Sequence, residues 1–188
     1  GVRAPACSAI LADFVPEYDA TTVARLRQAG AIIMGKTVTT EFACGDPSPT
    51  RNPWNAEHTP GGSSSGSAVG VSVGMFPASL GSQTAGSVLR PASFNGVVGL
   101  KPTFSRVSRY GVVPVAWSLD TMGCFTRTVE DAAITLGAIA GHDPKDPYTW
   151  DVAVPDFRKA LTRDIRGLRV GVLAEQIYTD LVDEEVRL

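Results

Sequence analysis

Two turns rich in glycine and serine, at residues 61–66 and 81–87, constrain the fold of this chain more than any other feature of its sequence. Ser63 in the first turn and Ser87 in the second are 24 residues apart. A stretch of small residues and then a short apolar run fill the interval, which predicts a helix followed by a buried strand. A helix and a strand can fold back on each other, so we expect the two turns to lie side by side.

The second turn also has the composition of a catalytic loop. Small residues let backbone N–H groups approach a bound oxygen closely. A series of such groups before a serine is suited to an oxyanion hole beside a nucleophile. A flexible linker is disfavoured because apolar runs flank the turn on both sides.

Other glycine-rich motifs do not fit. A phosphate-binding loop needs a lysine where Ser87 stands. The GxSxG turn of α/β-hydrolases needs glycines where Ala85 and Leu89 stand. His58 and His142 lie in proline-rich loops without a convincing Asp partner, so a Ser-His-Asp triad is also disfavoured.

Charge and cysteine content exclude further classes of protein. The chain has 17 Lys and Arg against 19 Asp and Glu, and 44% of its residues are hydrophobic. We therefore expect a folded chain that binds neither nucleic acid directly nor a membrane. Cys7, Cys44 and Cys124 are widely spaced and form no CxxC pair, which favours buried thiols in a reducing, cytoplasmic compartment over a disulfide or a zinc site.

Helical and apolar segments alternate along the chain, which predicts an α/β fold with a mixed, mostly parallel sheet covered by helices. We expect residues 41–62 to form a loop, because prolines and glycines recur there. Asp19 is a candidate N-cap of the first helix, and Thr128 with Asp131 resembles a capping box for the last one. The predicted helices span about 19–30, 64–75 and 129–140, and the predicted strands are 31–34, 78–82, 97–100 and 168–173, with 112–115 as strand or turn.

An ordered set of motifs closely resembles the amidase signature family of Ser-Ser-Lys hydrolases. The resemblance covers most of residues 1–175. Its main segments are GGSSSGS at 61–67, GSQTAGSV at 81–88, RPAS at 90–93 and GVVGLKPT at 96–103. It implies the family's fold, amide C–N chemistry and no metal or organic cofactor.

The resemblance assigns roles to individual residues. Ser87 matches the nucleophile that is acylated, and the backbone amides of Thr84, Ala85, Gly86 and Ser87 match the oxyanion hole. Ser63 matches the serine that relays a proton, and in the family the peptide bond before that serine is cis. The proton passes to a neutral lysine.

The lysine is the first departure from the family pattern. Lys36 and Lys101 match other family positions, so neither is assigned the role of the base. The family places the catalytic lysine shortly before the position of Gly1. We therefore expect residues 1–188 to be the central part of one amidase signature domain, incomplete at both ends.

The second departure surrounds the nucleophile. Gln83 and Ala85 stand where many members have Asp and Gly. Arg90 follows Ser87 by three residues, as in members that act on small carboxylated amides, so it is a candidate clamp for a substrate carboxylate.

The resulting expectation is an amidase that hydrolyses a linear, small carboxamide. One alternative is the A subunit of an aminoacyl-tRNA amidotransferase, in which Arg tends to follow the serine by two residues. Another alternative is a non-catalytic fragment or scaffold. Expected partners are the amide substrate and either the remainder of the amidase domain or further copies of the chain.

Overall fold

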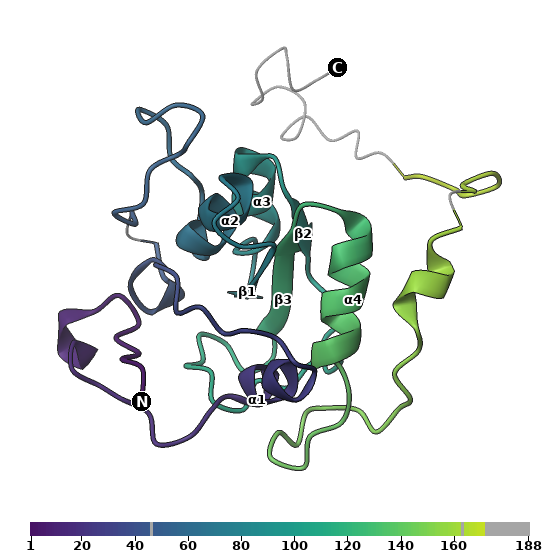
Figure 1. The fold of residues 1–188 in the computed structure, drawn as a ribbon, viewed down its shortest axis with the longest axis horizontal. Coiled ribbons are helices and arrows are strands. Elements are labelled where there is room, and N and C mark those ends of the chain that lie inside the picture. The colour runs from purple at the N-terminus through teal and green to yellow at the C-terminus, as the bar shows by residue number, and fades with distance from the viewer. Residues whose placement is uncertain (46, 163, 172–188) are drawn as a thin grey trace.

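The computed structural model describes residues 1–45, 47–162 and 164–171. Figure 1 shows a small sheet with helices packed around it and long loops at both ends. The helices are α1 (Thr21–Gln28), α2 (Ser65–Ser72), α3 (Leu89–Asn95) and α4 (Val129–Ile139), with short 3-10 turns at Ala9–Leu11, Glu41–Ala43 and Phe157–Ala160; the strands are β1 (Ala78–Gln83), β2 (Val98–Leu100) and β3 (Thr121–Thr126).

The sheet has the order β1-β3-β2, with β3 in the centre. Both pairings are antiparallel, with Gly81 opposite Gly123 on one side and Leu100 opposite Cys124 on the other. The α/β class is therefore as predicted. The mostly parallel pairing is not confirmed, because both pairings in the described part of the chain are antiparallel.

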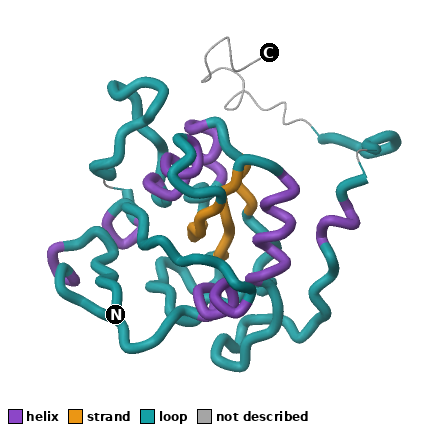
Figure 2. Tube along the Cα trace, viewed as in Figure 1, coloured by secondary structure: helices purple, strands orange, loops and turns teal. Residues whose placement is uncertain are grey.

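Helices cover both faces of the sheet (Figure 2). On one face, Phe125 packs with the apolar side chains of α2 and α3, including Val71 and Ala92. On the other face, Met122 packs with Leu136 and Ile139 of α4. Since successive residues of a strand point to opposite faces, β3 supplies both cores and is buried along its whole length.

α2 approaches β1 closely because Gly81 has no side chain. A Cβ atom at Gly81 would lie 2.7 Å from Oγ of Ser64 and 2.6 Å from the ring of Phe125. Two hydrogen bonds join the same elements: Ser67 Oγ donates to the Leu80 carbonyl (2.8 Å), and Ser79 Oγ donates to the Ser67 carbonyl (2.9 Å). The helix is thereby fixed against the strand that leads to the second turn.

The predicted strand at 31–34 is wrong. This segment lies in no strand, and the side chains of Ile32 and Met34 are 88% and 72% exposed. The physical reason is that an apolar run becomes a buried strand only beside a pairing partner, and the described sheet offers it none. Residues 168–171 also lie in no strand, and the remaining two residues of that prediction fall outside the described part.

Other boundaries are close to the predictions. α4 begins after Thr128, whose hydroxyl accepts a hydrogen bond from the Asp131 amide, so the capping prediction is confirmed. α1 is capped at Ala20 without a side-chain bond, and Asp19 instead pairs with Arg27 (3.3 Å). Segment 112–115 is irregular chain with bends and forms no strand, whereas α3 and β3 were not predicted.

The prediction of buried cysteines is correct only for Cys124. Cys7 and Cys44 are exposed, and all three thiols are free. Among the described residues, no helix combines the length and hydrophobicity needed to cross a membrane.

Candidate active site

The two glycine- and serine-rich turns meet through their backbones. The Ser64 amide donates a hydrogen bond to the Ser87 carbonyl (3.3 Å), and the Thr40 amide donates one to the Ser63 carbonyl (3.0 Å). The peptide bond between Gly62 and Ser63 is cis, as the family resemblance implied. The structure therefore brings the two predicted serine turns side by side.

Ser63 is buried and Ser87 is half-buried. Within the described part of the chain, neither hydroxyl takes part in a hydrogen bond. A direct proton relay between the two side chains thus remains a proposal.

Gln83, the last residue of β1, shapes the turn that carries Ser87. Its side chain is 3% exposed. Oε1 accepts hydrogen bonds from the amides of Val88 (2.8 Å) and Leu89 (2.9 Å). Nε2 donates to the carbonyl of Ala85 (2.8 Å). Gln83 therefore caps the start of α3 and holds the preceding loop.

The backbone amides of Thr84, Ala85, Gly86 and Ser87 donate no hydrogen bond to any described residue. Four successive unused N–H groups next to a half-buried serine have the composition of an oxyanion hole, as predicted from the sequence. Their role as an oxyanion hole stays a prediction.

Asp120, which directly precedes β3, holds the start of the same turn from the neighbouring strand. Its Oδ1 accepts from Thr84 Oγ1 (2.5 Å), and its Oδ2 accepts from the amides of Val115 (2.8 Å) and Ala116 (3.0 Å). The carboxylate is 7% exposed. The sequence offered no signal for Asp120, because β3, the strand that follows it, was not predicted.

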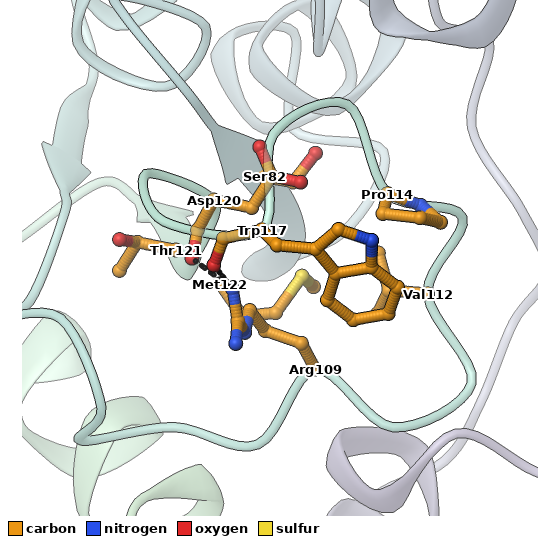
Figure 3. A pocket seen from close by; sticks show the side chains of 8 residues that line it. All are labelled: Ser82, Arg109, Val112, Pro114, Trp117, Asp120, Thr121 and Met122. Carbon is orange, nitrogen blue, oxygen red and sulfur yellow. Dashed lines mark hydrogen bonds between the residues drawn. The ribbon is translucent and has the colours of Figure 1, made fainter. Parts of the chain in front are cut away.

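A pocket opens next to Asp120 (Figure 3). It is lined by Ser82, Arg109, Val112, Pro114, Trp117, Asp120, Thr121 and Met122. Ser87 lines neither this pocket nor the open groove formed by Asn52, Trp54, Asn55, His58, Thr59 and Phe94.

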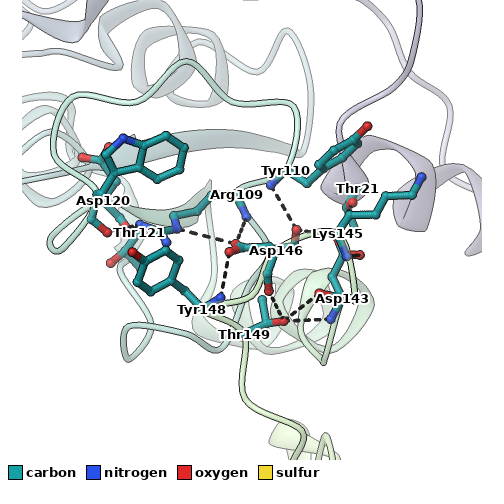
Figure 4. A network of polar contacts seen from close by, with 12 residues as sticks. Thr21, Arg109, Tyr110, Asp120, Thr121, Asp143, Lys145, Asp146, Tyr148 and Thr149 are labelled. Carbon is teal, nitrogen blue, oxygen red and sulfur yellow. Dashed lines mark hydrogen bonds and ion pairs between the residues drawn. The ribbon is translucent and has the colours of Figure 1, made fainter.

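Arg109, which lines this pocket, is buried and binds the loops that carry Trp117 and Asp146. Its Nη1 donates to the Trp117 carbonyl (2.5 Å), and its backbone amide donates to Asp146 (2.8 Å). The rings of Phe104 and Tyr148 each lie 4.9 Å from the guanidinium carbon. Figure 4 shows Arg109 in this network beside Asp146 and Tyr148, and the bond to the Trp117 carbonyl ties the 112–120 segment to it.

Asp143 anchors the same network to α1. Its Oδ2 accepts from Thr21 Oγ1 (2.5 Å) and Ser108 Oγ (2.6 Å). Burial raises the pKa of the Asp143 carboxyl. The hydrogen bonds and the charge of Arg25 lower it by more, so the pKa lies below its ordinary value.

Arg90 contacts the first turn rather than an acidic residue. Its Nε and Nη2 both donate to the carbonyl of Gly62, at 3.0 and 2.7 Å. The side chain is otherwise exposed, and Nη1 has no hydrogen-bond partner among the described residues. Arg90 therefore joins the two turns and keeps one edge open to solvent.

The two lysines that match family motifs, Lys36 and Lys101, make no hydrogen bond to Ser63 or Ser87 in the described part of the chain. Lys36 is exposed, and Lys101 Nζ donates to the Pro102 carbonyl (2.8 Å). Among the described residues, no group of three or more His, Cys, Asp or Glu side chains is arranged to hold a metal ion.

Comparison with known proteins places this site in a family. The sequence matches the Amidase family profile over residues 1–188. It is 50% identical to the A subunit of glutamyl-tRNA(Gln) amidotransferase from Carboxydothermus hydrogenoformans, and the match covers 100% of this chain and 40% of that protein. The chain thus spans about 40% of the length of the curated relatives it matches.

Solved structures show the same relationship. The crystal structure of the glutamyl-tRNA(Gln) amidotransferase A subunit from Thermotoga maritima is 48% identical, with a TM-score of 0.79 over 81% of this chain and 35% of that one. Native peptide amidase from Stenotrophomonas maltophilia is 46% identical, with a TM-score of 0.76 over 81% of this chain and 34% of that one. With a profile match along its entire length and these structural neighbours, the chain belongs to the amidase family, whose members are the amidase signature enzymes.

Proposed function

We propose that the protein carrying this chain cleaves the C–N bond of a linear carboxamide through an acyl-enzyme on Ser87. The observation that supports it best is the backbone contact between Ser64 and Ser87, which holds two serine turns together beside four unused amides. Family membership supports amide C–N chemistry, as hydrolysis or as transfer.

In the proposed mechanism, Ser87 Oγ attacks the amide carbonyl carbon, and its proton passes through Ser63 to a lysine base of the same protein. The amides of residues 84–87 stabilise the oxyanion of the tetrahedral intermediate. The C–N bond then breaks, and the leaving nitrogen takes the proton back through Ser63. Water attacks the acyl-enzyme by the same route and releases a carboxylate.

The test uses the whole gene product that carries this sequence. Ammonia release is measured on a panel of primary amides for the parent protein, Ser87→Ala and Ser93→Ala, an exposed serine of α3 that serves as the matched control. We expect the first variant alone to lose turnover. A fluorophosphonate probe should label Ser87, which a non-catalytic scaffold would not allow. Undiminished turnover by Ser87→Ala would refute the proposal.

We propose further that the open edge of Arg90 binds a carboxylate of the substrate. A charge-assisted hydrogen bond contributes about 1.5–3 kcal/mol, so Arg90→Gln should raise KM for carboxylated amides by roughly 10- to 150-fold. Neutral amides of the same size are the control. An equal loss on both classes would show that Arg90 acts through the Gly62 carbonyl alone.

The A subunit of an aminoacyl-tRNA amidotransferase is the second candidate. The relatives that carry the name of the glutamyl-tRNA(Gln) amidotransferase A subunit, at 48–50% identity, favour it. It predicts that the protein purifies from its source with stoichiometric partner chains and uses glutamine as the ammonia donor. A protein that purifies alone and turns over small amides at full rate supports the hydrolase instead.

A further inference from the structure

The amide group of Gln83 has one possible orientation in this structure. Two N–H donors, from Val88 and Leu89, point at one end of the side chain, and a carbonyl acceptor, from Ala85, lies at the other. Only an oxygen satisfies the first end and only an NH₂ group satisfies the second. The oxygen of the Gln83 amide is therefore needed to accept from Val88 and Leu89, and its NH₂ group is needed to donate to Ala85.

The bond from Gln83 to Ala85 also fixes the direction of the next N–H group. In a trans peptide, the carbonyl of one residue and the amide of the following residue point in opposite directions. The Ala85 carbonyl is turned toward buried Gln83, so the Gly86 N–H is turned away from it. Gly86 is half-buried and Ala85 is exposed, so this N–H points to the open side of the turn.

We propose that Gln83 is a positioning residue that aims the Gly86 amide at the oxyanion formed during attack by Ser87. This inference rests on the proposed function and deepens it. The side-chain NH₂ of Gln83 holds the Ala85–Gly86 peptide in its catalytic orientation, while the side-chain oxygen caps α3. A glutamate at position 83, which has the length of glutamine and is one methylene longer than the aspartate of many family members, would keep the cap but put a negatively charged oxygen against the Ala85 carbonyl.

Gln83→Glu separates these two roles, since it replaces only the NH₂ group. Loss of one oxyanion donor lowers kcat by roughly 10²- to 10³-fold in other enzymes. We expect a fall of roughly 10²-fold in kcat at pH 8 with little change in KM, because the donor acts mainly in the transition state. Gln28→Glu, the same change at an exposed site of α1, should leave kcat unaltered.

The pH profile distinguishes positioning from simple structural damage. A protonated carboxyl group can donate to the Ala85 carbonyl, so the ratio of variant to parent kcat should rise as the pH falls toward 5. Gln83→Met, which removes both ends, should show no such recovery. Parent-like kcat for Gln83→Glu at pH 8, or a loss that acid does not reverse, would overturn the inference.

Failure of the proposed function would give a different experimental result from failure of this inference. In that case the parent protein and Ser87→Ala would have the same activity, whatever residue occupies position 83. Crystal structures of Gln83→Glu at pH 8 and pH 5 then decide the inference. We expect the Ala85–Gly86 peptide to be turned at pH 8 and restored at pH 5, whereas a parent-like peptide at pH 8 would contradict it.

Discussion

Ser64 donates its backbone amide to the backbone carbonyl of Ser87, so the contact between the two turns uses no side-chain atom of either serine. Substitution of a serine side chain in either turn therefore leaves this contact available. As a result, a loss of activity in such variants reports on the hydroxyl that was removed rather than on separation of the turns.

Ser63→Ala is the first variant to which this applies. If the Ser63 hydroxyl relays the proton, its removal should lower kcat by roughly 10²- to 10⁴-fold, the usual contribution of general acid–base catalysis. Unfolding in urea should show little change in stability. Ser72→Ala is the control, because the Ser72 hydroxyl of α2 donates to the Asn95 carbonyl of α3 (2.8 Å) and has no part in the relay. Parent-like turnover by Ser63→Ala would exclude the relay.

Asp120→Ala should weaken both the fold and the site. It leaves the Thr84 hydroxyl and the amides of Val115 and Ala116 without their acceptor, and a buried group without a partner costs about 1–3 kcal/mol. The measurement is the free energy of unfolding together with kcat. Asp120→Asn should recover most of both, since its oxygen can serve the two amides while the Thr84 hydroxyl rotates to accept. Equal losses in the two variants would contradict this account.

Asp143 should make stability depend on pH in acid. Its folded pKa is lowered, so its stabilising contribution is present above the unfolded value of about 3.9 and is lost as the pH falls through the folded value. Asp143→Asn should therefore be less stable than the parent at neutral pH, and the difference should shrink below about pH 4. Urea unfolding across this range measures it, with exposed Asp151→Asn as the control. A difference that stays constant down to about pH 2 would rule out this linkage.

The three thiols should differ in reactivity. Burial raises the pKa of Cys124 to about 12, and the thiolate is the form that reacts. In the folded protein at pH 8, iodoacetamide should modify exposed Cys7 and Cys44 and spare Cys124. All three should react after unfolding. Mass spectrometry of the alkylated peptides measures this, and rapid alkylation of Cys124 in the folded state would be the contrary result.

The sequence predicted the contact between the two turns better than it predicted the sheet. The glycine and serine spacing placed Ser63 and Ser87 in adjoining turns because that prediction needs only local geometry. β3 was missed because it lies in the centre of the sheet, with Met122, Gly123 and Cys124 in place of the alternating β-branched residues that mark most strands. β3 is buried by α2, α3 and α4, and the residues next to β3 in the sequence give no information about this packing.

The side chains that support the turn were also beyond a reading of motifs. Gln83 was noted only as a departure from the family pattern, and Asp120 had no assigned role. The Thr84 hydroxyl becomes the partner of Asp120 only when β1 and β3 are paired, and the Ala85 carbonyl becomes the partner of Gln83 only once the turn after β1 has its shape. Arg90 differs from these two residues, because the sequence did assign it a role. Its proposed contact with a substrate carboxylate and its observed bond to Gly62 use different edges of one guanidinium group.

Gly81 sets the distance between α2 and β1, and the contact between the two serine turns depends on this distance. Its missing Cβ would lie within 3 Å of both Ser64 and Phe125, so even a single methyl group at this position would act as a wedge between α2 and β1. Such a wedge would tilt the start of α2 and lengthen the gap that the Ser64–Ser87 contact spans. Efforts to re-engineer this scaffold for new amides can vary the exposed residues of the turns, but they should leave position 81 unaltered.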